Sequence, residues 1–202
     1  MTPWPRCAPR TQAALGLALC AVLAWPALRH ALEASMWRHM VLQFPLLMLA
    51  GALLAAALPQ RARAAVARCN AHGIAGLVFV AMVLAVLMVP RVLDLALRDP
   101  AIEAAKCAAL LGAGAALRLS WRVAGWVVQG FFLGNMLPMT AVVGELYIDT
   151  PLRLCNAYLL DDQARLGQWL VGLAALLALG WLARVGWWMV RREGDALAVE
   201  NA

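Results

Sequence analysis

The sequence predicts an all-α, polytopic membrane protein. We expect six transmembrane helices in a single domain over residues 1–202, with both termini in the cytoplasm. The chain is 64% hydrophobic, has a mean hydropathy of +0.76 and is only 14% charged, whereas soluble domains carry roughly 25% charged residues. Its apolar residues form runs of about 18 or more, the length that a helix needs to cross lipid. They do not alternate with polar residues, as they would in a transmembrane barrel.

The apolar runs place the six spans at about 11–28, 40–58, 73–89, 101–117, 123–146 and 166–190. The first span follows a short Pro- and Arg-bearing tail. This start also fits a secretory signal peptide, but we interpret it as an uncleaved anchor. Pro138 interrupts the fifth span, and Arg191 and Arg192 close the sixth. The intervening stretches 29–38, 59–71, 90–100 and 118–122 are predicted as links, loops or a tight turn, and 145–165 as the longest outer connection.

The distribution of arginine gives the predicted orientation. The connection Pro59 to Ala71 carries three arginines and no acid, so we place it in the cytoplasm by the positive-inside rule. The inner segments then hold ten arginines and three acids, while the outer segments hold seven basic and eight acidic residues. The second span therefore begins at the outer face.

The high pI of about 9.6 comes from the same arginines and does not indicate nucleic acid as a partner. These arginines lie between apolar runs, where they set the orientation of the chain in the membrane. Membrane lipid is the expected surrounding.

The five cysteines form no CxxC or zinc pattern. Because no nucleophile triad, phosphate loop or dinucleotide fingerprint is present, we do not expect an enzyme. Gly130 and Gly134 form a small-xxx-small pair and predict close helix packing.

The stretch SMWRHMVLQFPLLMLAG, from Ser35 to Gly51, contains the first candidate metal ligands. Spacings of three and four residues place Met36, His39, Met40 and Gln43 on one helical face. The topology brings further candidates to the same outer side of the membrane, which gives the set His39, Met40, Met36, Met88, Glu103, Cys107 and Asp162. Thioether, thiol and imidazole groups suit cuprous copper, so copper is the one cofactor expected. The alternative is that the methionines are packing residues and that His39 is hydrogen-bonded.

Four segments in this order resemble the CtaG-type cytochrome c oxidase assembly proteins. His39-Met40 before an apolar run resembles that family's HM-containing helix start. VPRVLDLALRDP resembles its HLPxxYDxAL segment, IEAAKCAALLGAG its HxxEH-then-Gly helix, and DDQARLGQW its DQxxAGxxxW ending. The resemblance covers roughly Met36 to Trp169. It implies a polytopic protein of the bacterial inner membrane that helps to mature a copper-containing oxidase, with an oxidase subunit as partner.

The chain also departs from the family pattern. Where the family offers further histidines, this sequence has Gln43, Met88, Glu103 and Cys107, and Leu93 stands at the tyrosine position. The chain is also one span shorter. Met88 and Cys107 suit cuprous copper, but the substitutions equally fit a chain in which metal binding is lost.

Three functions remain open from the sequence. The first is an assembly factor for a respiratory copper-containing cytochrome c oxidase that binds or relays copper at the periplasmic face. The second is a non-catalytic membrane scaffold or accessory subunit of a respiratory or other membrane complex. The third is a small transporter, which is supported only by Pro45, Pro138 and a few amides within the spans.

Overall fold

Helices form nearly all of the chain in a computed structural model that describes residues 8–200. Within that range the backbone contains no strand. The predicted tail residues Arg6 and Cys7 lie outside the described residues. The elements in chain order are α1 (Pro9–Ala24), α2 (Pro26–Glu33), the π-helical turn η1 (Arg38–Gln43), α3 (Phe44–Leu54), the 3₁₀ turn η2 (Ala55–Ala57), α4 (Gln60–Cys69), α5 (Ile74–Leu87), α6 (Pro90–Arg98), α7 (Pro100–Trp121), α8 (Trp126–Asp149) and α9 (Leu160–Glu200).

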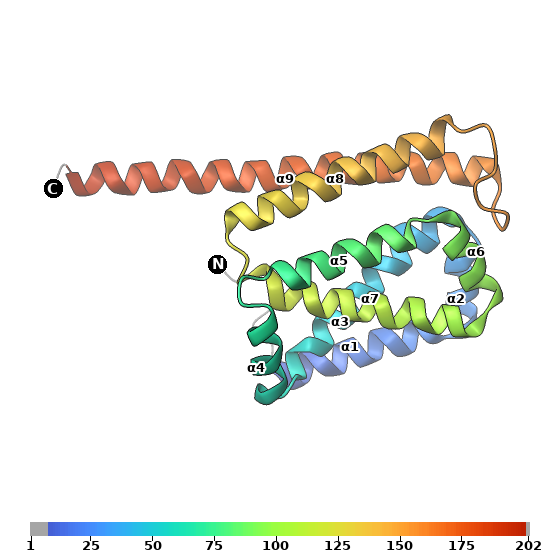
Figure 1. The fold of residues 1–202 in the computed structure, drawn as a ribbon, viewed down its shortest axis with the longest axis horizontal. Coiled ribbons are helices and arrows are strands. Elements are labelled where there is room, and N and C mark those ends of the chain that lie inside the picture. The colour runs from blue at the N-terminus through green and yellow to red at the C-terminus, as the bar shows by residue number, and fades with distance from the viewer. Residues whose placement is uncertain (1–7, 201–202) are drawn as a thin grey trace.

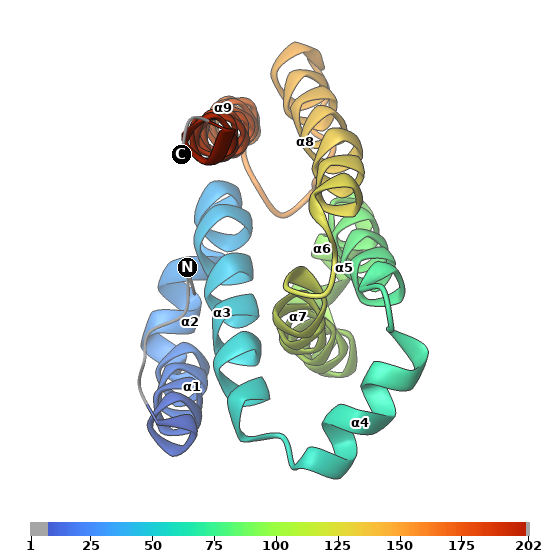
Figure 2. The same cartoon turned by 90° about the vertical axis from the view of Figure 1, so that its left-hand side faces the viewer.

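The helices fall into two groups. The helices α1, α3, α5 and α7 form one bundle, and α8 and α9 form a long hairpin that lies along it (Figures 1 and 2). Within the hairpin, α8 and α9 pack mainly against each other, and the hairpin contacts the bundle mainly through η1 and α5.

Four continuous helical stretches are long and apolar enough to cross a membrane: Arg38–Ala57, Pro100–Trp121, Trp126–Asp149 and Leu160–Arg192. Two bent pairs bring the number to six if each pair counts as one span: α1 with α2, bent by 71°, and α4 with α5, bent by 86°. The all-helical fold is thus confirmed, with several helices long and apolar enough to cross a membrane. The number of six spans and the cytoplasmic termini stay predictions.

Several predicted boundaries are wrong, mostly because proline redirects a helix without ending helical structure. The first predicted span continues to Leu28, but the helix breaks at Trp25, whose backbone is extended. Pro26 has no N–H to continue the ladder and starts α2 instead. The predicted loops 59–71 and 90–100 contain α4 and α6, which begin directly after Pro59 and at Pro90.

Two further predicted interruptions are absent from the described helices. The predicted turn 118–122 is largely the last turn of α7, which runs to Trp121. The predicted break at Pro138 does not occur, because α8 continues through it. The nearby side chains of Asn135 and Thr140 bond carbonyls one turn earlier, at 2.7 and 2.8 Å.

The helices α3 and α7 approach each other closely. A Cβ atom at Gly51 would collide with the backbone of Leu111, and one at Gly114 with the backbone of Met48. Only glycine therefore permits this approach. The predicted packing pair differs: Gly130 faces the ring of Trp181, but a Cβ atom at Gly134 would meet nothing within 4 Å.

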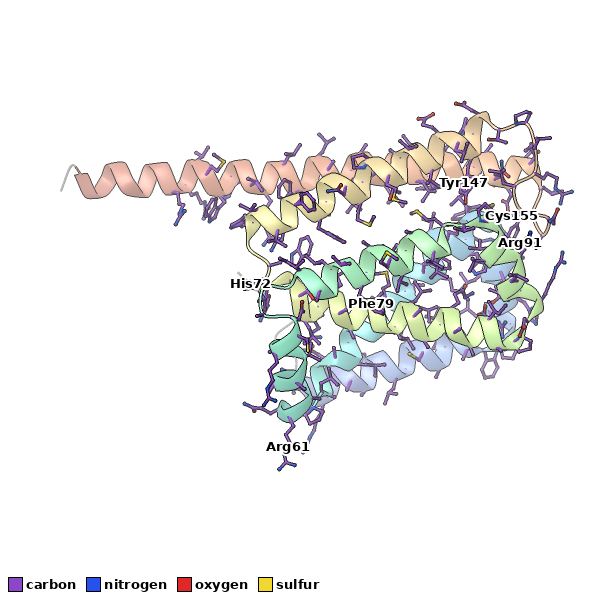
Figure 3. All side chains as sticks on the ribbon, in the orientation of Figure 1. Arg61, His72, Phe79, Arg91, Tyr147 and Cys155 are labelled. Atoms are coloured by element: carbon purple, nitrogen blue, oxygen red, sulfur yellow. The ribbon has the colours of Figure 1, made fainter. Side chains whose placement is uncertain are left out.

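Polar residues lie at opposite ends of the fold (Figure 3). Arg61 and His72 lie at one end, and Arg91, Tyr147 and Cys155 lie at the other (Figure 3). The predicted inner loop and the predicted outer connections are therefore on opposite ends, as a membrane topology requires.

Candidate functional site: a buried polar cluster

His39 lies at the start of the second predicted span, within η1. This turn buries His39, Met40 and Gln43, and the exposed fraction of His39 is 0%. A π-helical turn is wider than an α-helical one and is often found at functional sites. Here it turns an imidazole and an amide into the bundle on the side facing α7.

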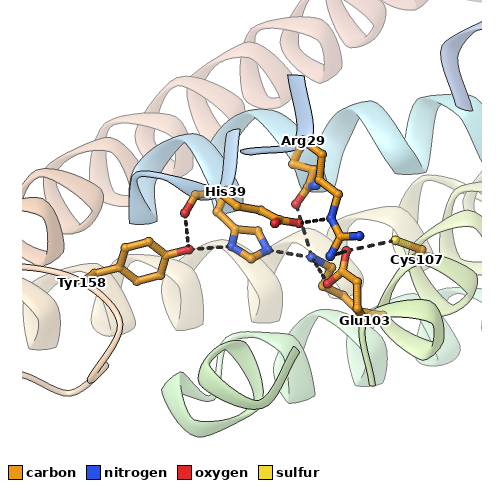
Figure 4. A network of polar contacts seen from close by, with 8 residues as sticks. Arg29, His39, Glu103, Cys107 and Tyr158 are labelled. Carbon is orange, nitrogen blue, oxygen red and sulfur yellow. Dashed lines mark hydrogen bonds and ion pairs between the residues drawn. The ribbon is translucent and has the colours of Figure 1, made fainter. Parts of the chain in front are cut away.

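Both ring nitrogens of His39 are engaged (Figure 4). Nδ1 lies 2.8 Å from the hydroxyl of Tyr158, and Nε2 lies 2.7 Å from Nζ of Lys106. The Tyr158 hydroxyl donates to the carbonyl of Glu33 at 2.9 Å, so it accepts from Nδ1–H. Nε2 is then the acceptor for the lysine. This hydrogen-bond network assigns a neutral imidazole with its proton on Nδ1.

Tyr158 precedes α9, in the connection between the hairpin's two helices. Burial raises the pKa of its hydroxyl above the ordinary value, and the charge of Glu33 adds to the effect. The hydroxyl therefore keeps its proton and stays a donor to the Glu33 carbonyl. Its two hydrogen bonds join the α8–α9 connection to α2 and η1.

Lys106 is the only lysine of the chain, and it is almost completely buried on α7. Besides His39, its ammonium group donates to the Gln43 amide oxygen at 3.3 Å and lies 2.7 Å from Oε2 of Glu103. Nζ of Lys106 and Oε2 of Glu103 form a close ion pair. This contact does not have the geometry of a hydrogen bond, because Oε2 has no hydrogen-bond partner. Two hydrogen-bond acceptors and one carboxylate oxygen thus surround the ammonium.

The remaining charges balance the cluster. Oε1 of Glu103 accepts from the Cys107 thiol at 3.5 Å and lies 3.8 Å from the guanidinium of Arg29. Arg29 also pairs with Glu33 at 2.8 Å. Two cations and two carboxylates therefore offset each other around a neutral His39. Such pairing is required where charges leave water.

Asp162 lies beside the cluster and contacts other residues. Its carboxylate accepts from the Ser35 hydroxyl at 2.7 Å and from the backbone N–H of Met36 at 2.6 Å. Asp94 holds the preceding connection in the same way, accepting from the backbone N–H groups of Asn156 and Ala157. Both aspartates position backbone at this end of the fold.

The seven predicted ligands are therefore divided among separate places. His39, Glu103 and Cys107 belong to the polar cluster, and Asp162 binds the backbone of Met36. The Met36 side chain is fully buried in the apolar core. Met40 and Met88 line a cavity between the bundle and the hairpin. Among residues 8–192, whose side chains are described, no group of three or more His, Cys, Asp and Glu side chains is arranged to hold a metal ion.

The cavity between the bundle and the hairpin has a volume of about 260 Å³. Its lining is almost wholly apolar. Three methionines that sequence reasoning did not single out join the two predicted ones, so the methionine-lined cavity is defined by Met40, Met48, Met88, Met136 and Met139. Five of the nine methionines of the chain thus meet here.

Sequence reasoning missed Arg29, Lys106 and Tyr158. A signal existed for Lys106, because a single lysine within an apolar helix must find acceptors inside the protein. Arg29 and Tyr158 carry no such signal, since both lie in connections between predicted spans.

No protein-family model, curated protein or solved structure matches this chain. The geometry of the cluster and of the methionine-lined cavity is therefore the basis for functional inference.

Proposed function

We propose that this chain is a non-catalytic scaffold in a complex of the bacterial inner membrane. The resemblance of four sequence segments to the CtaG-type assembly proteins favours a respiratory cytochrome c oxidase during its assembly as that complex. The main support is that the polar cluster is closed on itself. The two nitrogens of His39, the ammonium of Lys106 and the hydroxyl of Tyr158 all face partners within the chain. Such groups join helices and leave no base or nucleophile for a substrate.

The α8–α9 hairpin provides the contact surface in this proposal. Only 6% of the apolar window of α8 is buried within the chain. Val127 and Phe131 lie one turn apart on α8 and are 86% and 76% exposed. In a membrane these side chains face either lipid or the helix of another protein, and we propose the second.

Co-purification tests the scaffold. The chain, tagged and extracted in a mild detergent, should carry a larger membrane complex at fixed stoichiometry. Replacing Val127 and Phe131 by alanine should reduce the yield of that complex at least threefold. Leu17 and Val22 on α1 are 62% and 53% exposed and provide the matched control, whose alanine variants should leave the yield unchanged. Isolation of the native chain alone would contradict the proposal.

The methionine-lined cavity favours a second candidate function, the relay of cuprous copper to the oxidase. Thioethers are soft ligands that prefer this ion. Met40 and Met88 are both predicted ligands, and they lie in the cavity with three further thioethers. The competing explanation is that methionine fills irregular gaps between apolar helices.

A competition titration of purified chain with a chromogenic cuprous chelator tests the second function. We expect about one copper per chain, and at least a tenfold weaker affinity when Met48, Met136 and Met139 are all replaced by leucine. Met82 is exposed and lies outside the cavity, so its leucine variant is the control. If the native chain leaves all copper with the chelator, copper relay is wrong, whereas the scaffold is unaffected.

A further inference from the structure

The surroundings of the Lys106 ammonium are those of a cation-binding site. His39 Nε2 at 2.7 Å, Gln43 Oε1 at 3.3 Å and Glu103 Oε2 at 2.7 Å surround its nitrogen. The ring of Phe44 adds its face, with the ring centre 5.9 Å from Nζ. An aromatic face at this distance attracts a cation.

We propose that His39, Gln43 and Glu103 form a cation-binding site whose resident ligand is the ammonium of Lys106, so that the native chain takes no metal ion at His39. This inference does not depend on the proposed function. It also separates His39 from the methionine-lined cavity, where copper relay would have to occur.

The distances explain why lysine excludes a metal. A metal bound to an imidazole nitrogen sits about 2.0–2.1 Å from it. Along the line from Nε2 to Nζ, which is 2.7 Å long, that position is about 0.6 Å from the lysine nitrogen. The metal and the ammonium cannot both be present. Glu103 would also lose its closest positive partner if Lys106 moved away.

A second cavity, of about 310 Å³, lies against the side chain of Lys106. It is apolar, and Phe79, Val83, Leu87 and Ile102 line it together with Lys106. Replacing Lys106 by alanine deletes three methylenes and the ammonium, which are the atoms of n-propylammonium. The deleted volume would join this cavity, so propylammonium has both the shape and the charge to refill the site.

Thermal unfolding of the Lys106→Ala variant in detergent tests the proposal. Propylammonium should raise its Tm by about 3–6 °C at ten times the dissociation constant. It should not raise the Tm of the native chain or of Lys106→Met, whose side chain fills the space. 1-Propanol lacks the charge and tetramethylammonium lacks N–H donors, so neither should act. If folded Lys106→Ala does not respond, or if the native chain responds equally, the proposal is wrong.

A second measurement on the native chain decides the matter if Lys106→Ala does not fold. Because Lys106 is the only lysine, its acylation by an amine-reactive ester is read directly from one peptide by mass spectrometry. We expect acylation at pH 9 to be at least 100-fold slower in the folded chain than in the denatured chain, and at least tenfold faster in Glu103→Gln than in the native chain. Equal rates in folded and denatured chains would overturn the proposal. So would cuprous binding by the native chain that His39→Ala abolishes.

Discussion

Replacing Tyr158 by phenylalanine should destabilise the fold by removing a hydroxyl that makes two hydrogen bonds. The hydroxyl accepts from Nδ1–H of His39 at 2.8 Å and donates to the carbonyl of Glu33 at 2.9 Å. Phenylalanine keeps the ring and leaves both of these groups without that partner. A buried polar group without a partner costs about 1–3 kcal/mol. We therefore expect Tyr158→Phe to lower the free energy of unfolding by about 2–4 kcal/mol.

Tyr147 provides a matched control, because it is the only other tyrosine of the chain and is also buried. Its hydroxyl has one partner, the carbonyl of Met88 at 2.8 Å. Tyr147→Phe should cost about 1–2 kcal/mol. The assay is reversible unfolding of both variants by SDS in mixed micelles, followed by tryptophan fluorescence. If Tyr158→Phe is no more destabilising than Tyr147→Phe, His39 and Tyr158 are not coupled as described.

The remaining predictions concern packing, a backbone contact and a buried thiol. Gly114→Ala should lower the free energy of unfolding by about 1–3 kcal/mol, because its Cβ atom would collide with the backbone of α3. Gly134→Ala is the control: its Cβ atom would enter open space, so the same SDS titration should show no change. Asp162→Ala removes an ionised acceptor of two hydrogen bonds and should cost about 2 kcal/mol. Burial, together with a nearby carboxylate, raises the pKa of Cys155 to about 12. Such a thiol stabilises the folded state below its ordinary pKa near 9 and loses that contribution as pH rises toward 12, so stability between pH 9 and 12 should fall less steeply in Cys155→Ala than in the native chain. Maleimide labelling of the native chain at pH 8 should modify the exposed Cys69 and leave Cys155 unmodified.

The positions of the long helices could be predicted because each depends on the length of one apolar run. The ends of the helices could not, because they depend on local backbone chemistry. Pro26 and Pro90 follow apolar runs and suggest a stop, yet both are at the first position of a new short helix. The apolar face of α6, with Leu93 and Ala96 buried, explains why the segment after Pro90 is helical. A count of apolar residues cannot distinguish such a helix from a loop.

The polar cluster could be predicted only in part. His39 and Glu103 stand out in the sequence as polar side chains beside apolar runs, and they do lie near each other. Lys106 is one turn after Glu103 in the sequence, but its partner His39 is 67 residues away. Tyr158 is 119 residues from His39. Contacts between groups so far apart in the chain depend on how α7 and the start of α9 pack against η1. The spacing of residues within one helix gives no information about that packing.

The separation of the predicted ligands follows from what each side chain requires in a membrane. Carboxylate, guanidinium and ammonium groups need partners of opposite charge where water is absent, so Arg29, Glu33, Glu103 and Lys106 gather into one balanced cluster that also takes up His39. Thioethers need no partner, so methionines remain free to line an apolar cavity. The predicted ligands are thereby divided between two places. His39 and Glu103 surround the ammonium of Lys106, whereas Met40 and Met88 line a cavity of about 260 Å³ that has room for an ion. If the chain handles copper, the methionine-lined cavity is therefore the place where binding must be sought, and a His39 variant should leave it intact.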